Sequence, residues 1–246
     1  MKTRYFSNLT WQEFGEIVPK KTSTVILPVG TIEAHGVIPL GTDNIIPQDI
    51  AEYTAEKINA LIAPPVNYGI TSSLLPYPGS ITLEKDTYKK MILEIMLELA
   101  RNKFRTIIVM NGHGGQVDEL KEAALETFKK TGTRVIVVHW WILTYEWTKE
   151  FYGQMGGHAG IDETAAVMAI SPELVKPERY SESMPREYKR GIQSYPFAGP
   201  IILYKEGEGM PLFDADKARK FYIKARDIIL SEIKSILKSY KELNID

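Results

Sequence analysis

Two carboxylates and a histidine lie close together in the sequence, directly after an apolar run. Glu33 and His35 are in the loop that follows residues 24–29, and Asp43 returns on a turn beside Gly41. In an extended backbone, side chains two positions apart point to the same side, so Glu33 and His35 can face one ligand. Imidazole and carboxylate groups are common ligands of divalent metals. The pattern therefore predicts a divalent-metal site at this loop.

Glycine-rich loops also surround two further histidines. His113 lies in Asn-Gly-His-Gly-Gly and His158 in Gly-Gly-His-Ala-Gly, while His35 precedes Gly36. Glycine removes side-chain bulk and lets the backbone turn sharply, which gives a small ligand or metal access to the imidazole. Three such loops in one chain are hard to assign to chance. The fourth histidine, His139, follows a strand-like run and is equally compatible with packing at a strand end.

Composition favours a cytoplasmic protein that acts on small molecules. The 246 residues carry 30 basic and 31 acidic side chains, a net charge of −1, so neither a nucleic acid nor an anionic membrane is expected as a partner. No apolar stretch approaches the ~18 residues of a membrane span, and residues 1–8 lack the apolar core of an export signal. Without cysteine, any metal must be held by histidine and carboxylates.

Strand-like and helix-like segments alternate along the chain. Apolar runs typical of buried strands cover residues 24–29, 62–66, 106–110 and 134–138, and helical spacing covers 51–61, a segment from 86 to 100, 117–130, 164–170 and 216–243. This alternation predicts an α/β fold with a mainly parallel sheet and helices on both faces. We expect a single domain over residues 1–246, with 177–211 as an excursion or hairpin.

The sequence resembles the creatininase (creatinine amidohydrolase) family in motifs that keep the family's order over residues 25–170. They are Gly-Thr-Ile-Glu-Ala-His-Gly (30–36), Pro-Leu-Gly-Thr-Asp (39–43), Pro-Gly-Ser-Ile-Thr-Leu (78–83), Asn-Gly-His-Gly-Gly (111–115) and Gly-His-Ala-Gly-Ile-Asp-Glu-Thr (157–164). Each motif is weak alone, but together they are specific. The resemblance implies a three-layer α/β/α fold, a hydrolytic site with two divalent metal ions (zinc or manganese), and often a hexamer.

The resemblance also assigns roles to single residues. The positions that match the family's metal ligands are Glu33, His35, Asp43, His113 and Glu163. Asp43 matches the bridging ligand and His158 a proton shuttle, although Asp162 is an alternative to Glu163 because either could cap a helix. Two ions bridged by a carboxylate can share a water and lower its pKa, and an imidazole can protonate the leaving nitrogen.

Three positions depart from the family pattern. The family's type member carries a metal-binding Glu where this chain has Gly115, so the resemblance implies that Glu163 supplies that carboxylate. The same change argues against creatinine as the substrate. The loop at residues 36–39 is one residue shorter than usual, and Gln116 replaces an Asn.

These features together predict a metal-dependent amidohydrolase-type enzyme that cleaves a C–N bond of a small substrate. A creatinine-like lactam, a formamide on a pyrimidine or purine precursor, and a terminal peptide bond all remain open. The alternatives are hydrolysis of a cyclic diketone C–C bond in polyol or inositol catabolism, a sugar isomerase-like enzyme, and a non-catalytic metal-binding protein. One aromatic group, either a substrate wall or else core and subunit interface, comprises Trp140, Trp141, Tyr145 and Trp147.

Overall fold

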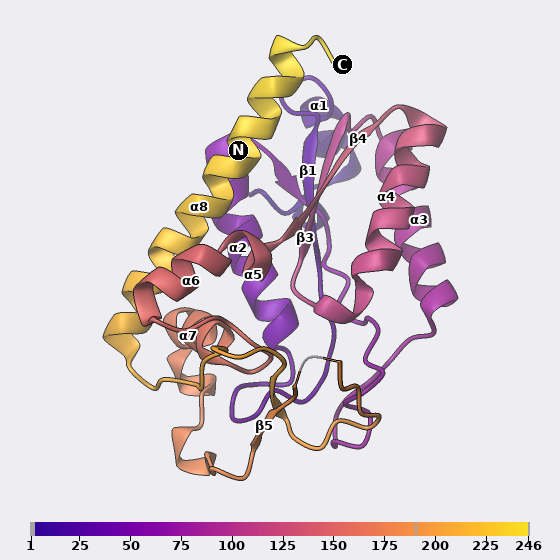
Figure 1. Cartoon of the computed structure of the whole chain (residues 1–246). Coiled ribbons are helices and arrows are strands. Elements are labelled where there is room, and N and C mark those ends of the chain that lie inside the picture. The colour runs from indigo at the N-terminus through magenta and orange to yellow at the C-terminus, as the bar shows by residue number, and fades with distance from the viewer. Residues whose placement is uncertain (1–2, 190, 246) are drawn as a thin grey trace.

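A parallel sheet forms the centre of the structure, a computed structural model that describes residues 3–189 and 191–245. Its strands are β1 (Thr24–Val29), β2 (Leu61–Ile62), β3 (Thr106–Asn111) and β4 (Arg134–His139), in the order β2-β1-β3-β4 (Figure 1). Every neighbouring pair is parallel. β-Branched residues are frequent in these strands, and such residues pack well in a sheet that is covered on both faces.

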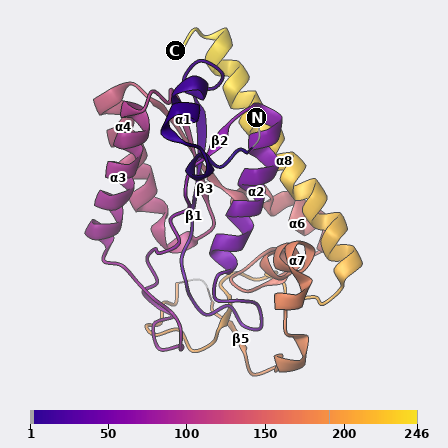
Figure 2. The same ribbon diagram turned by 180° about the vertical axis from the view of Figure 1, so that it is seen from behind.

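Helices cover both faces of the sheet. One face carries α2 (Thr42–Ile58), α7 (Ile161–Ile170) and α8 (Ala215–Glu242), and the other carries α3 (Lys85–Arg101) and α4 (Val117–Thr131) (Figures 1 and 2). Strand residues alternate between the two cores: Ile26 and Ile108 pack with α2 and α8, whereas Val25 and Ile107 pack with α3 and α4. This arrangement confirms the predicted α/β fold.

Shorter elements complete the described part of the chain. They are η1 (Phe6–Asn8), α1 (Trp11–Ile17), η2 (Gly114–Gln116), α5 (Trp140–Leu143), α6 (Tyr145–Tyr152), η3 (Pro172–Leu174), η4 (Pro177–Arg179), β5 (Pro185–Glu187) and β6 (Ile201–Leu203). None of the helices in the described ranges is both long and apolar enough to cross a membrane.

The carboxyl ends of the strands meet at one edge of the sheet. Val29 at the end of β1 pairs with Asn111, which in turn pairs with His139. From β1 the chain passes to β2 on one side and then to β3 on the other. Ligands of open α/β sheets bind at such a switch point, outside the carboxyl ends of the strands. The loops after β1 and β3 therefore begin where a site is expected.

Two predicted boundaries are wrong, and proline is involved in both. The helix expected over residues 51–61 begins at Thr42 and contains Pro47 in its interior, although proline favours the first turn of a helix. The early start places Asp43 in the first turn of α2 rather than in a loop. The strand expected over 62–66 stops at Ile62, because residues 64–65 are prolines without an N–H to continue the ladder.

The segment 177–211 does not fold as a hairpin. β5 and β6 pair in parallel, so the chain crosses over between them. The segment then contacts two of the histidine loops: Gly36 N donates to Pro200 O at 2.9 Å, and Ile202 N donates to His158 O at 3.1 Å. The excursion thus holds both loops through backbone hydrogen bonds.

Candidate metal centre

All six residues singled out by the sequence converge at the carboxyl edge of the sheet. Candidate ligand atoms lie within 4.8 Å of one another in three groups: Glu33, His35 and His158; Glu33, Asp43 and His113; and His35, Asp43 and Glu163. They come from the loop after β1, the first turn of α2, the loop after β3, and the start of α7 with the loop before it. Folding therefore brings together residues as far apart in the sequence as Glu33 and Glu163.

Asp43 occupies the middle of the cluster. Its Oδ1 lies 3.1 Å from His35 Nε2, and its Oδ2 lies 2.9 Å from His113 Nδ1. Glu33 Oε1 is 3.2 Å from the same His113 nitrogen, and Glu163 Oε2 is 3.7 Å from His35 Nε2. The two oxygens of Asp43 thus face two different imidazoles, each of which has a second carboxylate beside it.

Backbone carbonyls fix the tautomer of each imidazole. One ring nitrogen of every cluster histidine bonds a backbone oxygen: His35 Nδ1 to Glu33 O at 3.0 Å, His113 Nε2 to Ile70 O at 2.7 Å, and His158 Nε2 to Ala34 O at 2.8 Å. Because a carbonyl only accepts, the bonded nitrogen must donate its proton. In the neutral ring the other nitrogen then presents a lone pair to the carboxylates, as in metal-binding histidines.

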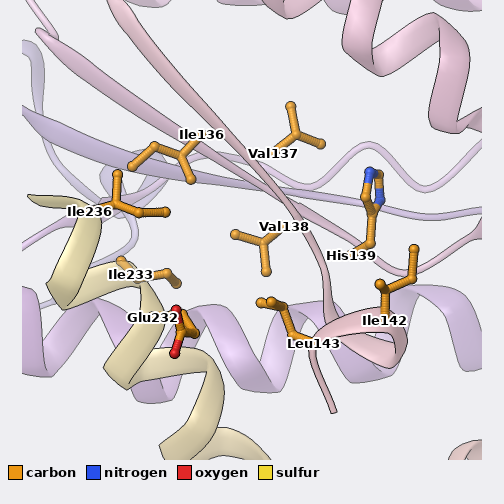
Figure 3. Close-up of a pocket in the computed structure, with 9 residues that line it drawn as sticks. All are labelled: Ile136, Val137, Val138, His139, Ile142, Leu143, Glu232, Ile233 and Ile236. Carbon is orange, nitrogen blue, oxygen red and sulfur yellow. The ribbon is translucent and has the colours of Figure 1, made fainter. Parts of the chain in front are cut away.

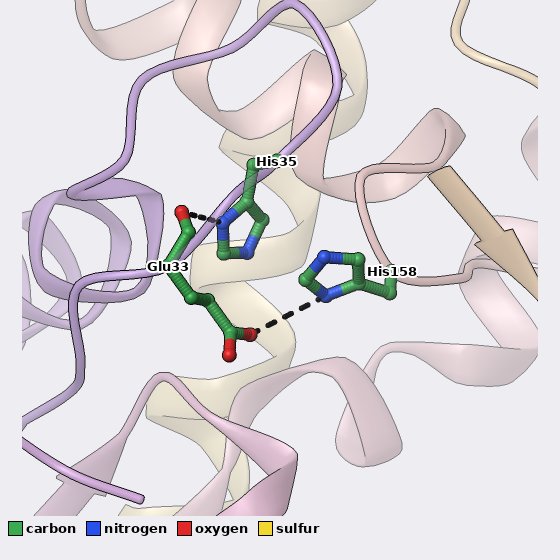
Figure 4. A group of neighbouring side chains, drawn as sticks. All are labelled: Glu33, His35 and His158. Atoms are coloured by element: carbon green, nitrogen blue, oxygen red, sulfur yellow. Dashed lines mark hydrogen bonds and ion pairs between the residues drawn. The ribbon is translucent and has the colours of Figure 1, made fainter. Parts of the chain in front are cut away.

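His158 lies beside His35. The two rings are 4.2 Å apart between centroids, and His158 Nδ1 is 3.6 Å from Glu33 Oε1. Figure 4 shows the His158 ring turned toward the Glu33 carboxylate, with the His35 ring between the Glu33 backbone and His158. The unprotonated nitrogen of His158 therefore points into the same group of ligand atoms.

Adjacent carboxylates of α7 hold the loop that carries His158. Asp162 Oδ1 accepts from Gly157 N at 3.1 Å, and Glu163 Oε2 accepts from Ala159 N at 2.6 Å. Ala159 adopts a left-handed φ of +54°, which is uncommon outside glycine. Asp162 belongs to none of the three groups of candidate ligands, whereas Glu163 does, and its Oε2 lies 3.7 Å from His35 Nε2.

Two glycines allow close packing around the Asp43 backbone. A Cβ added at Gly30 would lie 2.1 Å from Asp43 O, and one added at Gly112 would lie 2.0 Å from it. Pro47, four residues after Asp43, has no N–H to donate to that carbonyl. The glycines of two sequence motifs thus serve to bring the ends of β1 and β3 against the start of α2.

Buried negative charge dominates the cluster. Burial alone would lower the pKa of His35, but Asp43 and its neighbouring carboxylates raise it to about 10. The pKa of His113 is likewise raised well above its usual value by Glu33 and Asp43, against the effect of burial. Burial raises the pKa of Glu163 to about 8. These pKa directions indicate that the cluster carries uncompensated negative charge when its imidazoles are neutral.

The donor set fits divalent metal ions. His35 Nε2 and Asp43 Oδ2 are buried and make no hydrogen bond with good geometry, despite the short distances to their neighbours. Unsatisfied buried polar atoms are rare and costly in native proteins. Histidine and carboxylate ligands around a bridging aspartate would satisfy both atoms if cations lay between them, so these residues could hold two ions.

His158 is partly buried beside this cluster but differs electrostatically from its neighbours. Burial, and after it the positive charge of a protonated His35, lower the pKa of His158 to about 4. The ring is therefore neutral near pH 7 and keeps its Nδ1 lone pair. A neutral imidazole held in one tautomer can accept a proton at that nitrogen.

Three supporting residues were not identified from the sequence as part of a site. Thr71 Oγ1 donates to Glu33 Oε2 at 2.9 Å, Asn111 Nδ2 donates to His113 O at 2.8 Å, and Gln116 Nε2 donates to Asn111 Oδ1 at 2.9 Å. Asn111 and Gln116 flank His113 in the glycine motif, which was a usable signal. Nothing in the sequence around Thr71 marks it as a partner of Glu33.

A cavity of about 880 Å³ opens over the cluster and includes Glu33, His113, His158 and Glu163 in its lining. Its volume is near the upper end for small-molecule sites. The aromatic group of the sequence divides here: Trp141 and Tyr145 line the cavity. Trp140 is fully buried in the core that also contains residues of α8. Trp147 is partly buried and packs against the same core.

His139 lies apart from the cluster. It belongs to a mainly apolar pocket of about 180 Å³ that is lined by residues of β4, α5 and α8 (Figure 3). Its Nδ1 accepts from Asn111 Nδ2 at 2.9 Å, and its ring contacts Trp141. The packed strand-end position is therefore the one that the structure shows for this residue.

Known proteins share this sequence pattern. The Creatininase family model, described as creatinine amidohydrolase, matches residues 7–211. Creatinine amidohydrolase of Pseudomonas putida is 28% identical over 211 residues, which cover 76% of this chain and 79% of that protein. A mycofactocin precursor peptide peptidase of Mycobacterium ulcerans (strain Agy99) is 28% identical over 176 residues (67% and 65%). A 3-dehydro-scyllo-inosose hydrolase of Thermotoga maritima is 26% identical over 198 residues (75% and 61%).

Solved structures share the fold. An E122Q mutant creatininase of the Zn-Zn type superimposes with a TM-score of 0.79 at 24% identity, covering 96% of this chain and 98% of that one. A creatininase with Mn gives 0.73 at 24% identity, covering 98% of each. Because the family match spans most of the chain and the fold agrees over nearly all of it, the chain belongs to the creatininase family.

Proposed function

We propose that this creatininase-family hydrolase cleaves a C–N bond of a small amide, lactam or formamide at a centre that holds two divalent ions, zinc or manganese. The observation that carries the proposal is the position of Asp43, whose two carboxylate oxygens face nitrogen atoms of two different histidines at 3.1 and 2.9 Å. A carboxylate in that position is suited to bridge two ions. The proteins with Zn-Zn and Mn in their names support the choice of metals.

The three groups of ligand atoms indicate how the ions would be held. One group is Glu33, Asp43 and His113, and another is His35, Asp43 and Glu163, so together they use every proposed ligand and share only Asp43. The third group reuses two of those ligands and cannot be filled at the same time. Each ion would then have three protein ligands and an open position, as catalytic sites require. His158 is left free for proton transfer.

The reaction follows from these groups. Divalent ions would lower the pKa of water toward neutrality and polarise the substrate carbonyl. As the water oxygen bonds to the carbonyl carbon, the π electron pair moves to the carbonyl oxygen, and His158 Nδ1 accepts the proton that the water loses. His158 then delivers that proton to the leaving nitrogen while the C–N bond breaks, which yields a carboxylic acid and an amine. Its bond to Ala34 O keeps the ring in place.

Metal analysis tests the proposed centre. Elemental analysis of purified, metal-supplemented protein should find about two ions per chain. His113→Ala should lose metal because it removes a ligand, whereas His158→Ala should keep both ions and lose activity. Zero metal in the wild-type protein would refute the proposal, and normal turnover by His158→Ala would refute the role of His158.

A substrate screen tests the reaction. Lactams, formamides, peptides and cyclic diketones would be offered to the metal-loaded protein, and released amine, formate or ring-opened acid would be measured. Hydrolysis of a cyclic diketone alone would favour the second candidate, C–C bond hydrolysis in polyol or inositol catabolism. That candidate is supported by the relative named 3-dehydro-scyllo-inosose hydrolase. Tight metal binding without turnover of any compound would favour a non-catalytic role.

The assembly, the domain organisation and the location remain proposals. We propose a hexamer from the family resemblance, a single domain over the whole chain, and a cytoplasmic location from the composition. Light scattering coupled to size-exclusion chromatography measures the mass of the assembly directly. A mass that is not six times the 27.9 kDa of the chain would contradict the hexamer.

A further inference from the structure

The end of the excursion contributes to the cavity above the metal centre. The cavity lining includes Ile202 and Tyr204 from this segment together with Glu33, His113 and His158 from the centre. The segment is joined to the centre by a hydrogen bond from Ile202 N to His158 O at 3.1 Å. The excursion is thus part of the enclosure in which a substrate must lie.

Strand alternation places one tyrosine on the same face as Ile202. Side chains of an extended chain alternate between two faces, so residues 202 and 204 point to one side and residue 203 to the other. Ile202 and Tyr204 both line the cavity, and Leu203 between them does not. An antiparallel bridge joins Ile202 to His158, so Tyr204 lies two residues beyond the contact with the proposed proton shuttle.

The Tyr204 ring is held by its neighbours. Its backbone N–H donates to the Glu208 carboxylate. Its ring meets Phe197 edge-on with centroids 5.5 Å apart, and Tyr188 lies 6.2 Å away. Aromatic contacts of this kind restrict the two torsions of a tyrosine side chain. The ring of Tyr204 therefore packs on one side against this aromatic group, while the residue as a whole stays 40% exposed.

The Tyr204 hydroxyl has no hydrogen-bond partner among the residues that the structure describes. The neighbouring Tyr188 hydroxyl, by contrast, accepts from Ala198 N at 3.0 Å. Burial, and the charge of Glu33 after it, raise the pKa of Tyr204 above its usual value. The hydroxyl thus keeps its proton at neutral pH, and its donor is unused.

We propose that Tyr204 is a catalytic residue whose hydroxyl donates a hydrogen bond to the substrate carbonyl oxygen as that oxygen becomes negative. The assignment rests on the proposed hydrolysis at the metal centre. A neutral donor that is fixed in advance and aimed at developing charge stabilises a transition state without reorganisation. Tyr204 suits this role because its ring packs against Phe197, its hydroxyl has no partner among the described residues, and it lines the same cavity as Glu33 and His158.

Phosphate binding tests the hydroxyl without requiring a substrate. Inorganic phosphate, a tetrahedral oxyanion, would be titrated into zinc-loaded wild-type, Tyr204→Phe and Tyr188→Phe proteins by calorimetry. Tyr204→Phe should bind phosphate about tenfold more weakly, because it lacks the hydrogen bond to a charged group that the hydroxyl makes. Tyr188→Phe, which changes a tyrosine of the same aromatic cluster outside the cavity lining, should bind as the wild type does. Equal affinity of Tyr204→Phe and wild type, or no binding by the wild type, would overturn the assignment.

Kinetics with any substrate found in the screen provides the second readout. Loss of a donor to the developing oxyanion should lower kcat of Tyr204→Phe by about 100-fold while KM stays within a few-fold. A rise in KM with unchanged kcat would contradict a role in the transition state. Failure of the proposed function would appear differently, as a wild-type protein that binds phosphate through Tyr204 but hydrolyses none of the compounds.

Discussion

Replacement of Gly112 by alanine tests whether the backbone packing around Asp43 builds the metal centre. The added Cβ would lie 2.0 Å from Asp43 O and 2.8 Å from Pro47 Cγ. A carbon and an oxygen that are not bonded need roughly 3 Å or more, so the start of α2 must retreat from β3 by about 1 Å. Metal ligands tolerate displacements of only about 0.2 Å. Gly112→Ala should therefore lose one or both ions and about 1–3 kcal/mol of folding free energy, as overpacked sites do.

The matched control is Gly41→Ala, in the residue that precedes α2. There the nearest atom to an added Cβ is Ile32 Cδ1 at 3.9 Å, and φ is −91°, so alanine fits without strain. Metal content by elemental analysis and unfolding by urea would be measured for both variants and the wild type. Gly41→Ala should keep two ions per chain and lose at most a few tenths of a kcal/mol. Full metal content in Gly112→Ala would show that the Asp43 backbone is not clamped between the strands and would refute the reasoning.

Three further substitutions address single contacts. Asp162→Ala should destabilise the protein by about 1–3 kcal/mol in urea unfolding because it leaves the partly buried Gly157 N–H without its acceptor, whereas Asp162→Asn should cost less; equal losses would contradict the role of the hydrogen bond. Gln116→Leu removes the donor to Asn111 Oδ1 and should weaken metal binding about tenfold in chelator competition; unchanged affinity would show that Asn111 needs no support. Gly15→Ala, in α1 with no atom within 4 Å of the added Cβ, should raise stability by about 0.5–1 kcal/mol, and a loss would show hidden strain in α1.

The fold was largely predictable because its strands are simple. Residues 106–110 and 134–138 are apolar and β-branched, and each is followed by a helix or a glycine loop, which is the pattern of a parallel sheet. The structure places β3 and β4 at these residues, each with one further residue at its carboxyl end. The predicted boundaries failed where proline or a helix cap determines where an element begins or ends. At Thr42 the start of α2 depends on the packing of Gly30 and Gly112 against Asp43, which local helix propensity does not capture.

The candidate ligands could be found from the sequence because they lie at motif positions, but their geometry could not. Whether Asp162 or Glu163 faces the centre depends on where α7 begins. The helix begins at Ile161, three residues before the start that its apolar spacing predicts. Thr71 and Tyr204 reach the site through long-range folding from segments without a motif for it. Their contribution is a hydroxyl group, and hydroxyl residues are too common in loops for sequence spacing to single them out.

Gly115 supports the proposal that a carboxylate from another element completes the centre. A Cβ at residue 115 would lie 2.5 Å from His113 Nε2 and 2.6 Å from Ile70 O, between the two atoms that hydrogen-bond at 2.7 Å. Any side chain there would break the bond that fixes the tautomer of His113. A chain that orients this histidine through Ile70 therefore excludes a glutamate at 115, and a ligand for the other side of Asp43 has to come from elsewhere. Glu163 fits that requirement, since its Oε2 lies 3.7 Å from His35 Nε2 on the other oxygen's side of Asp43, where Oδ1 faces the same nitrogen at 3.1 Å.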